Sequence, residues 1–233
     1  MSDLNPKFIY FDLDDTLLDH KKAEQNGLKD IHSHFEEFND ISLEALINTY
    51  HSINKGLWEE YGRGEIDRHI LHRRRFEETL IELGIDGSLY EEVGKVYMEY
   101  YRNHWEWIDG AKEAFNKIRA NYNVGLITNG FAETQWMKIG QFGFEEMVSQ
   151  IVISEEVGVM KPHPKIFNHS TALVGLDRSE ILYVGDSLSS DVKGGKAAGW
   201  KVAWYVSNPD KEEKELADVV FNKWDELLNR LNI

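Results

Sequence analysis

The chain has 233 residues, of which 42% are hydrophobic and 29% charged, a composition typical of a globular protein with a buried core and not of a disordered one. Its 26 Lys and Arg against 41 Asp and Glu give a net charge of −15, which argues against a nucleic-acid polymer or a membrane surface as partner, because both bind basic surfaces. The absence of cysteine excludes disulfides, thiolate catalysis and Cys-based metal sites. No signal peptide and no apolar segment of about 18 residues is visible, so we expect a cytoplasmic protein.

Short apolar runs rich in β-branched and aromatic residues predict buried strands at 8–11, 124–128, 181–184 and 202–206. Weaker strands are expected at 150–154 and 218–221. Helical patterns lie at 111–120, 164–174 and 192–198. Because strands and helices alternate, the sequence predicts an α/β fold with a doubly wound parallel sheet.

Residues 19–108 interrupt this alternation with helical periodicity and no convincing strand. Two apolar stripes mark helices in this interval: Leu43, Leu46, Ile47 and Tyr50 in one, and Leu71, Phe76, Leu80 and Ile81 in the other. The sequence therefore predicts a helical domain at 19–108, inserted into an α/β core domain made of 1–18 and 109–233.

The first predicted strand ends in the acidic segment Asp12-Leu13-Asp14-Asp15-Thr16. Because successive strand side chains alternate, Asp12 and Asp14 can point to the same side. Two carboxylates at the carboxyl edge of parallel strands suit a hard cation such as Mg2+, or a nucleophile with an acid/base partner. Acids at this place also commonly cap the next helix, so the segment alone leaves both interpretations open.

Thr128 and Asn129 end the second strand, where a hydroxyl and an amide can bind a phosphate oxygen, although Thr-Asn-Gly is also an ordinary turn. Lys161 precedes Pro162 and Pro164, which restrict the chain. A lysine held in this way would bring positive charge to an acidic site, whereas a solvated surface lysine is the plain alternative.

The fourth strand leads into Gly185-Asp186-Ser187-Leu188-Ser189-Ser190-Asp191. Gly185 lets the backbone pass close to a ligand, Asp186 lies at the strand edge, and Asp191 follows after about one helical turn. Two acids so spaced can serve one cation, directly and through water, although Asp191 could equally begin a helix. All four segments fall at predicted strand ends, where a single crevice could collect them.

With these four motifs the sequence resembles the haloacid dehalogenase-like (HAD) hydrolase superfamily, over nearly the whole chain. The first motif, residues 12–16, and the fourth, residues 185–191, are together highly specific. The superfamily has a Rossmann-like α/β core and a cap between its first and second motifs, which is where this sequence has its helical insertion.

The resemblance implies a role for each motif. Asp12 would be the nucleophile, Asp14 the general acid/base, and Lys161 the stabiliser of the phosphoryl group and nucleophile. Thr128 and Asn129 would bind the phosphate. Mg2+ would be held by Asp12, the Asp14 carbonyl and Asp186, with Asp191 in support. Attack on phosphorus would give an aspartyl phosphate, and Mg2+ with Lys161 would offset the repulsion between four acids and a phosphate dianion.

Parts of the insertion and of the core, 53–58, 64–66, 71–76 and 153–167, look like the noncanonical pyrimidine 5′-nucleotidases, which act on nucleoside 5′-monophosphates. A related branch acts on N-acylneuraminate 9-phosphate, so a sugar phosphatase is the alternative. Trp58 could stack on a base, although a Trp at helical spacing is more often core. Arg75 could contact the substrate, because it has no acid four residues on, or it could anchor the insertion to an acid elsewhere.

Three other activities share parts of this pattern. A dehalogenase would use Asp12 against carbon without Mg2+, but carbon–halogen cleavage needs no proton for its leaving group and leaves Asp14 unexplained. A sugar phosphomutase would share all four motifs. A phospho-accepting signalling module also uses an acidic pair, Thr and Lys, but the long insertion disfavours it. The sequence therefore favours a Mg2+-dependent phosphatase acting on a small phosphate monoester.

Overall fold

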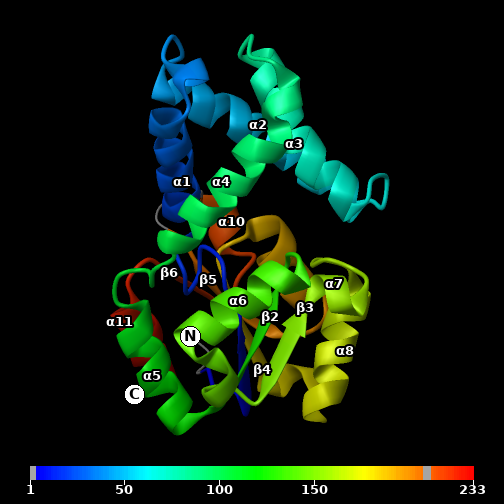
Figure 1. Ribbon diagram of the computed structural model, residues 1–233. Helices are drawn as coiled ribbons and strands as arrows, with labels where there is room; N and C mark the ends of the chain where they lie inside the picture. Colours follow the sequence, from blue (N-terminus) through cyan, green and yellow to red (C-terminus); the bar gives the residue numbers. More distant parts are fainter. Residues whose placement is uncertain (1–3, 207–210) are drawn as a thin grey trace. The chain divides into compact units, whose positions relative to one another are not determined.

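The computed structural model describes residues 4–206 and 211–233 (Figure 1). The chain divides into two compact units, one made of Met1–Asp19 and Trp107–Ile233 and the other of His20–Glu106. No helix in the described ranges has both the length and the apolar character needed to cross a membrane. The two units are called the α/β unit and the helical unit below.

The α/β unit is built on a six-stranded sheet in the order β3-β2-β1-β4-β5-β6, with every neighbouring pair parallel. Its strands are β1 (Phe8–Phe11), β2 (Asn123–Thr128), β3 (Gln150–Ile153), β4 (Ile181–Gly185), β5 (Lys201–Tyr205) and β6 (Val219–Phe221). The predicted doubly wound parallel sheet is confirmed. The strand order reverses between β1 and β4, and in such sheets ligands bind at the carboxyl ends of the strands beside this point.

Strand β1 is buried on both faces because its side chains alternate between two apolar clusters. Ile9 and Phe11 belong to one cluster, and Phe8 and Tyr10 to the other. The helices of this unit are α5 (Ala111–Asn121), α6 (Ala132–Phe142), α7 (Ser154–Val157), α8 (Pro164–Val174), α9 (Lys193–Ala197), α10 (Lys211–Lys214) and α11 (Trp224–Leu231). Helices α5 and α11 lie side by side in Figure 1.

The register of the central strands brings the predicted motifs to one edge. Phe11 pairs with Leu126 in β2 and with Val184 in β4. The backbone N–H of Asp12 then donates to the carbonyl of Val184 at 2.8 Å. Because the three strands are parallel and in register, the residues that follow them meet at a single edge of the sheet.

The helical unit consists of α1 (His20–His34), α2 (Leu43–Gly62), α3 (Arg68–Glu82) and α4 (Tyr90–Asn103), with short turns at Glu36–Phe38 and Gly87–Leu89. Helix α1 packs on α4, and α2 packs on α3 (Figure 1). The side chains of Ser42 and Asp67 cap α2 and α3 by accepting hydrogen bonds from backbone N–H groups of their first turns.

One predicted stripe of this unit is partly wrong. Leu71, Phe76 and Leu80 are buried as expected, but the side chain of Ile81 is 60% exposed. The buried face of α3 is completed by Arg75 and Thr79, and position 81 lies about 100° around the helix from position 80. The buried face of α3 thus includes two polar residues, and Ile81, which the apolar pattern assigned to this face, lies outside it.

Candidate active site

The buried ammonium of Lys161, in the segment before α8, lies at the centre of a group of side chains at the carboxyl edge of the sheet. Its Nζ lies 2.7 Å from Oδ1 of Asp12 and 2.9 Å from Oδ1 of Asp191. It also donates to the hydroxyl of Tyr183 at 2.7 Å and to the carbonyl of Ile127 at 3.1 Å. Lys161 is 3% exposed, so the alternative of a solvated surface lysine is wrong.

The charge of Lys161 follows from these neighbours. Burial alone lowers the pKa of a lysine, because it penalises the ammonium. The carboxylates of Asp12 and Asp191 outweigh this effect, and the pKa of Lys161 is raised above its ordinary value. The side chain therefore provides a permanent cation between two acids.

At Asp12 the surroundings favour the neutral form of the side chain. Burial raises the pKa of its carboxyl well above the usual range, Lys161 opposes the rise, and the nearby charges of Asp191 and Asp186 add to it. A carboxyl group attacks as a nucleophile only when it is ionised. Asp12 therefore needs more positive charge beside it than Lys161 alone supplies.

Three carboxylates of the α/β unit fit a divalent cation. Asp12, Asp186 and Asp191 each offer one oxygen, and these oxygens lie within 4.8 Å of one another. Carboxylate oxygens are the ligands that Mg2+ prefers, and on an octahedral ion they are about 3–4 Å apart. The donor type and the spacing therefore suit Mg2+.

Asp191 is held in place more firmly than its predicted supporting role required. It is fully buried in a π-helical turn, Leu188–Val192, just before α9. Its Oδ2 accepts a hydrogen bond from the backbone N–H of Ser187 at 3.0 Å, and its Oδ1 lies 3.2 Å from the hydroxyl of Tyr183. Tyr183 went unnoticed in the sequence because it lies within a uniformly buried strand.

Asn129 contacts the main chain of Lys161, which the sequence motif did not suggest. Its Oδ1 accepts a hydrogen bond from the backbone N–H of Lys161 at 2.8 Å, and its Nδ2 donates to the carbonyl of the same residue at 3.0 Å. The side-chain amide thus holds the main chain from which the buried ammonium extends. Phosphate binding by Asn129 stays a prediction.

The carboxylate of Asp14 contacts two side chains of α6 that the sequence analysis missed. Nζ of Lys138 lies 2.6 Å from its Oδ1, and Nε2 of Gln135 donates to its Oδ2 at 3.0 Å. The same Nε2 lies 2.5 Å from Oγ1 of Thr128. The sequence did contain a signal for them: Gln135 and Lys138 are three residues apart, at helical spacing, and share a face with the apolar Ile139.

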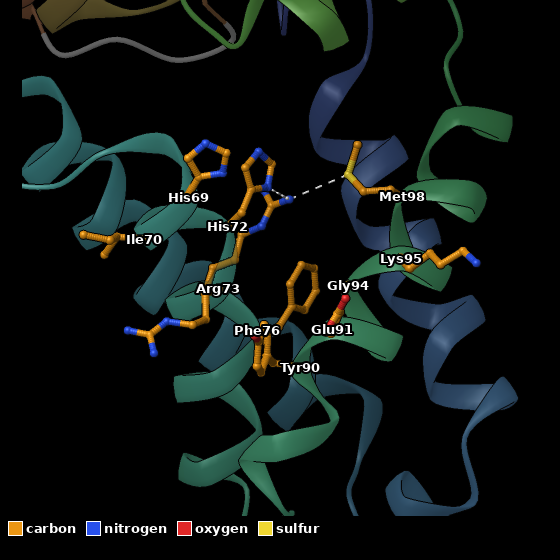
Figure 2. A pocket seen from close by; sticks show the side chains of 11 residues that line it. His69, Ile70, His72, Arg73, Phe76, Tyr90, Glu91, Gly94, Lys95 and Met98 are labelled. Atoms are coloured by element: carbon orange, nitrogen blue, oxygen red, sulfur yellow. Dashed lines mark hydrogen bonds between the residues drawn. The ribbon is translucent and has the colours of Figure 1, made fainter.

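The helical unit has a pocket of about 650 Å3, lined by residues of α3 and α4 (Figure 2). His72, Phe76 and Met98 project around it in Figure 2. Arg75 also lines it and is 7% exposed, with its guanidinium 5.0 Å from the centre of the Phe76 ring. Its Nη2 lies 3.0 Å from Nδ1 of His72 and 3.6 Å from the sulfur of Met98.

Arg75 has no carboxylate within ion-pair distance among the residues that the structure describes, and its buried Nε has no hydrogen-bond partner there. By contrast, Arg73 and Arg74 pair with Glu77 and Glu78 as their spacing predicts. Trp58 on α2 is half-buried and packs edge-on against Tyr61, with ring centres 5.6 Å apart. Substrate contacts by Arg75 and Trp58 stay predictions.

The family model described as haloacid dehalogenase-like hydrolase matches residues 9–205. The chain belongs to this family. The HAD hydrolase YfnB of Bacillus subtilis is 31% identical over 232 residues, covering 97% of this chain and 95% of that protein. A crystal structure of YfnB bound to magnesium matches with a TM-score of 0.83 at 29% identity, covering 98% of this chain and 100% of that one. The predicted family is thus confirmed.

Phosphatases with named substrates are similar as well. The pyrimidine 5′-nucleotidase YjjG of Escherichia coli is 34% identical over 211 residues, covering 90% of each chain. The glyceraldehyde 3-phosphate phosphatase of Pyrococcus abyssi is 31% identical over 207 residues, covering 85% of this chain and 81% of that protein. The predicted enzyme class is confirmed: this chain is a HAD-type phosphoric monoester hydrolase.

Proposed function

We propose that this enzyme hydrolyses a small phosphate monoester, with a preference for nucleoside 5′-monophosphates, through an aspartyl phosphate on Asp12. The observation that carries the proposal is the buried contact of Asp12 with Lys161, next to the acids Asp186 and Asp191. A carboxylate nucleophile beside a fixed cation, with two further acids that could hold a metal ion, suits nucleophilic attack on a phosphate.

In the first half-reaction the Asp12 carboxylate attacks phosphorus. The bond to the ester oxygen breaks, its electron pair stays on that oxygen, and a proton from Asp14 neutralises it. In the second half, Asp14 accepts a proton from water as the water oxygen attacks phosphorus, which releases phosphate and restores the Asp12 carboxylate. Lys161 offsets negative charge on the transferring group, and Thr128 donates to one of its oxygens.

Asp12, Asp186 and Asp191 would hold Mg2+, with the carbonyl of Asp14 as a further ligand that the motif suggests. When bound, the ion would neutralise charge on the phosphate and favour the ionised form of Asp12. The raised pKa of Asp12 supports this assignment, because Lys161 by itself does not overcome burial and the two neighbouring acids.

The helical unit is proposed as the cap domain that determines which leaving group is accepted. Its pocket with the buried Arg75 supports this role, because a guanidinium with no carboxylate partner among the residues that the structure describes suits an anionic or polar ligand group. The likeness to a pyrimidine 5′-nucleotidase supports the nucleotide preference. A sugar phosphate, such as N-acylneuraminate 9-phosphate or glyceraldehyde 3-phosphate, is the second candidate, supported by the likeness to a triose-phosphate phosphatase.

Phosphate release tests the proposal. The purified enzyme with Mg2+ is assayed on thymidine and deoxyuridine 5′-monophosphates, the two sugar phosphates and p-nitrophenyl phosphate, before and after chelation. We expect turnover that chelation removes and Mg2+ restores, with the nucleotides preferred. Asp12→Asn should lower kcat by at least about 10³-fold, whereas Asp40→Asn, an exposed acid of the helical unit, should not.

Full activity in excess chelator, or in Asp12→Asn, would contradict the assigned chemistry. A wild-type enzyme that prefers a sugar phosphate would leave the phosphatase chemistry in place and refute the nucleotide preference. Conversion of a sugar phosphate to its isomer without phosphate release would identify a mutase instead.

A further inference from the structure

Lys138 is a second buried lysine among the described residues of the α/β unit, and it contacts the acid/base candidate Asp14. It lies on α6, is 2% exposed, and places Nζ 2.6 Å from Oδ1 of Asp14. A buried ammonium is costly unless a negative charge and hydrogen bonds compensate for it. A helix position with this burial would ordinarily carry an apolar side chain, so the lysine calls for an explanation in terms of Asp14.

Gln135 binds the other oxygen of the same carboxylate. It lies one turn before Lys138 on the same face of α6 and is also 2% exposed. Its Nε2 is 3.0 Å from Oδ2 of Asp14 and 2.5 Å from Oγ1 of Thr128. Because an ionised carboxylate only accepts hydrogen bonds, the amide NH2 and not its oxygen faces Asp14.

The backbone beside Gln135 leaves room for this amide. Gly130 has a φ of +149°, a conformation that favours glycine, and a Cβ there would lie 3.0 Å from Cδ of Gln135. The N–H of Gly130 is held by Oγ of Ser154 at 3.1 Å. The turn after β2 is thus shaped around the side chain that connects Thr128 with Asp14.

We propose that Lys138 and Gln135 are positioning residues that fix the Asp14 carboxylate for proton transfer and couple it to the phosphate-binding hydroxyl of Thr128. The inference rests on the proposed function, because it concerns the proton that Asp14 gives to the leaving oxygen and later takes from water. Each carboxylate oxygen has a second lone pair, so one can carry that proton while both anchors stay in place. A free aspartate would sample several rotamers, and a misplacement of about 1 Å can cost about 10²-fold in rate.

Two aryl esters of similar size test the inference. Phenyl phosphate has a poor leaving group that needs a proton, whereas p-nitrophenyl phosphate has a good one that needs little help. We expect Lys138→Met to lower kcat for phenyl phosphate about 10- to 100-fold more than for p-nitrophenyl phosphate, with KM little changed. Lys138→Arg should restore part of the loss, because it keeps a cation at that place. Asp14→Asn should show the same selective loss and provides the reference.

Lys112→Met on α5 is the matched control, because Lys112 is exposed, and it should change neither ester. Gln135→Leu keeps the contact between Lys138 and Asp14, and we expect it to show a smaller selective loss of kcat for phenyl phosphate. This variant tests the inference if Lys138→Met does not fold. Equal losses for both esters, with a lower Tm, would make Lys138 a structural residue and overturn the inference.

The same assays separate this inference from the proposed function. A selective loss in Asp14→Asn without one in Lys138→Met and Gln135→Leu defeats only the positioning role. Equal losses for both esters in Asp14→Asn defeat the acid role on which the inference rests. Hydrolysis of neither ester by the wild-type enzyme, with Mg2+ present, defeats the proposed function itself.

Discussion

A Cβ atom at Gly185 would lie 2.5 Å from Oδ2 of Asp191. The sequence suggested that Gly185 lets the backbone approach a ligand, but the group that approaches it is the carboxylate of Asp191. This oxygen is also held by the N–H of Ser187 at 3.0 Å, so it cannot move without losing a hydrogen bond. The glycine of the fourth motif therefore makes room for one of the three acids that fit a metal ion.

Gly185→Ala should displace Asp191 and weaken Mg2+ binding. We expect the Mg2+ concentration for half-maximal activity to rise about 10-fold or more, and the free energy of unfolding to fall by about 1–3 kcal/mol. A Mg2+ titration of activity and urea denaturation measure the two effects. Gly56→Ala on α2 is the control, because its Cβ would meet nothing within 4 Å; it should be neutral or stabilise by up to about 1 kcal/mol. An unchanged Mg2+ requirement in Gly185→Ala would contradict the role given to Asp191.

Removing the cation between Asp12 and Asp191 should destabilise the α/β unit. Lys161→Met leaves two buried carboxylates facing each other, and breaking a buried ion pair costs about 3–5 kcal/mol. We expect a clear fall in the free energy of unfolding together with loss of turnover. In Lys161→Met with Asp12→Asn the fall should be smaller than the sum of the single effects, because the second change removes one repelling charge. Strictly additive effects in urea denaturation would refute the electrostatic explanation.

The helical unit should lose stability in mild acid through His72. Burial, together with the positive charges of Arg75 and Arg68 and the neighbouring His69, lowers the pKa of this imidazole from 6.5 to about 3. The folded state thus keeps His72 neutral, while the unfolded chain takes up a proton below about pH 6.5. The stabilising effect is present above pH 6.5 and is lost progressively as the pH falls toward 3.

Between pH 7 and pH 5 the free energy of unfolding should therefore fall by about 1 kcal/mol less in His72→Gln than in the wild type. This value is reduced to allow for the partial exposure of the ring. His69→Gln, one turn away and exposed, should follow the wild type. Urea denaturation at the two pH values measures the difference. Parallel losses in all three proteins would show that His72 does not titrate as its surroundings imply.

Arg75 should affect the choice of substrate more than the chemistry. Arg75→Met is expected to lower kcat/KM for thymidine 5′-monophosphate about 10-fold more than for p-nitrophenyl phosphate, because the small ester cannot use a remote contact. Arg73→Met, at an exposed arginine that pairs with Glu77, should leave the ratio unchanged. If Arg75→Met lowers both equally and melts earlier, the guanidinium acts by packing on Phe76.

The sequence alone determined the sheet and the family, because both depend on local patterns. Apolar runs are readable without tertiary information, so β1 was expected at 8–11 and is observed at Phe8–Phe11. Acids, a hydroxyl and a glycine directly after such runs must reach the same edge of a parallel sheet. The weaker expected strands form the two edges of the sheet, as β3 and β6.

Only the tertiary structure decided which side chains pair. Lys161 meets Asp12 across 149 residues, and Lys138 meets Asp14 across 124. No local pattern distinguishes a buried lysine from a solvated one, because the cost of burying its charge depends on partners that the fold brings from elsewhere. The apolar spacing of α3 likewise did not show that Arg75 is buried and Ile81 exposed. Patterns along the chain determine where strands and helices form, but the charge balance of a site is set by contacts between distant segments.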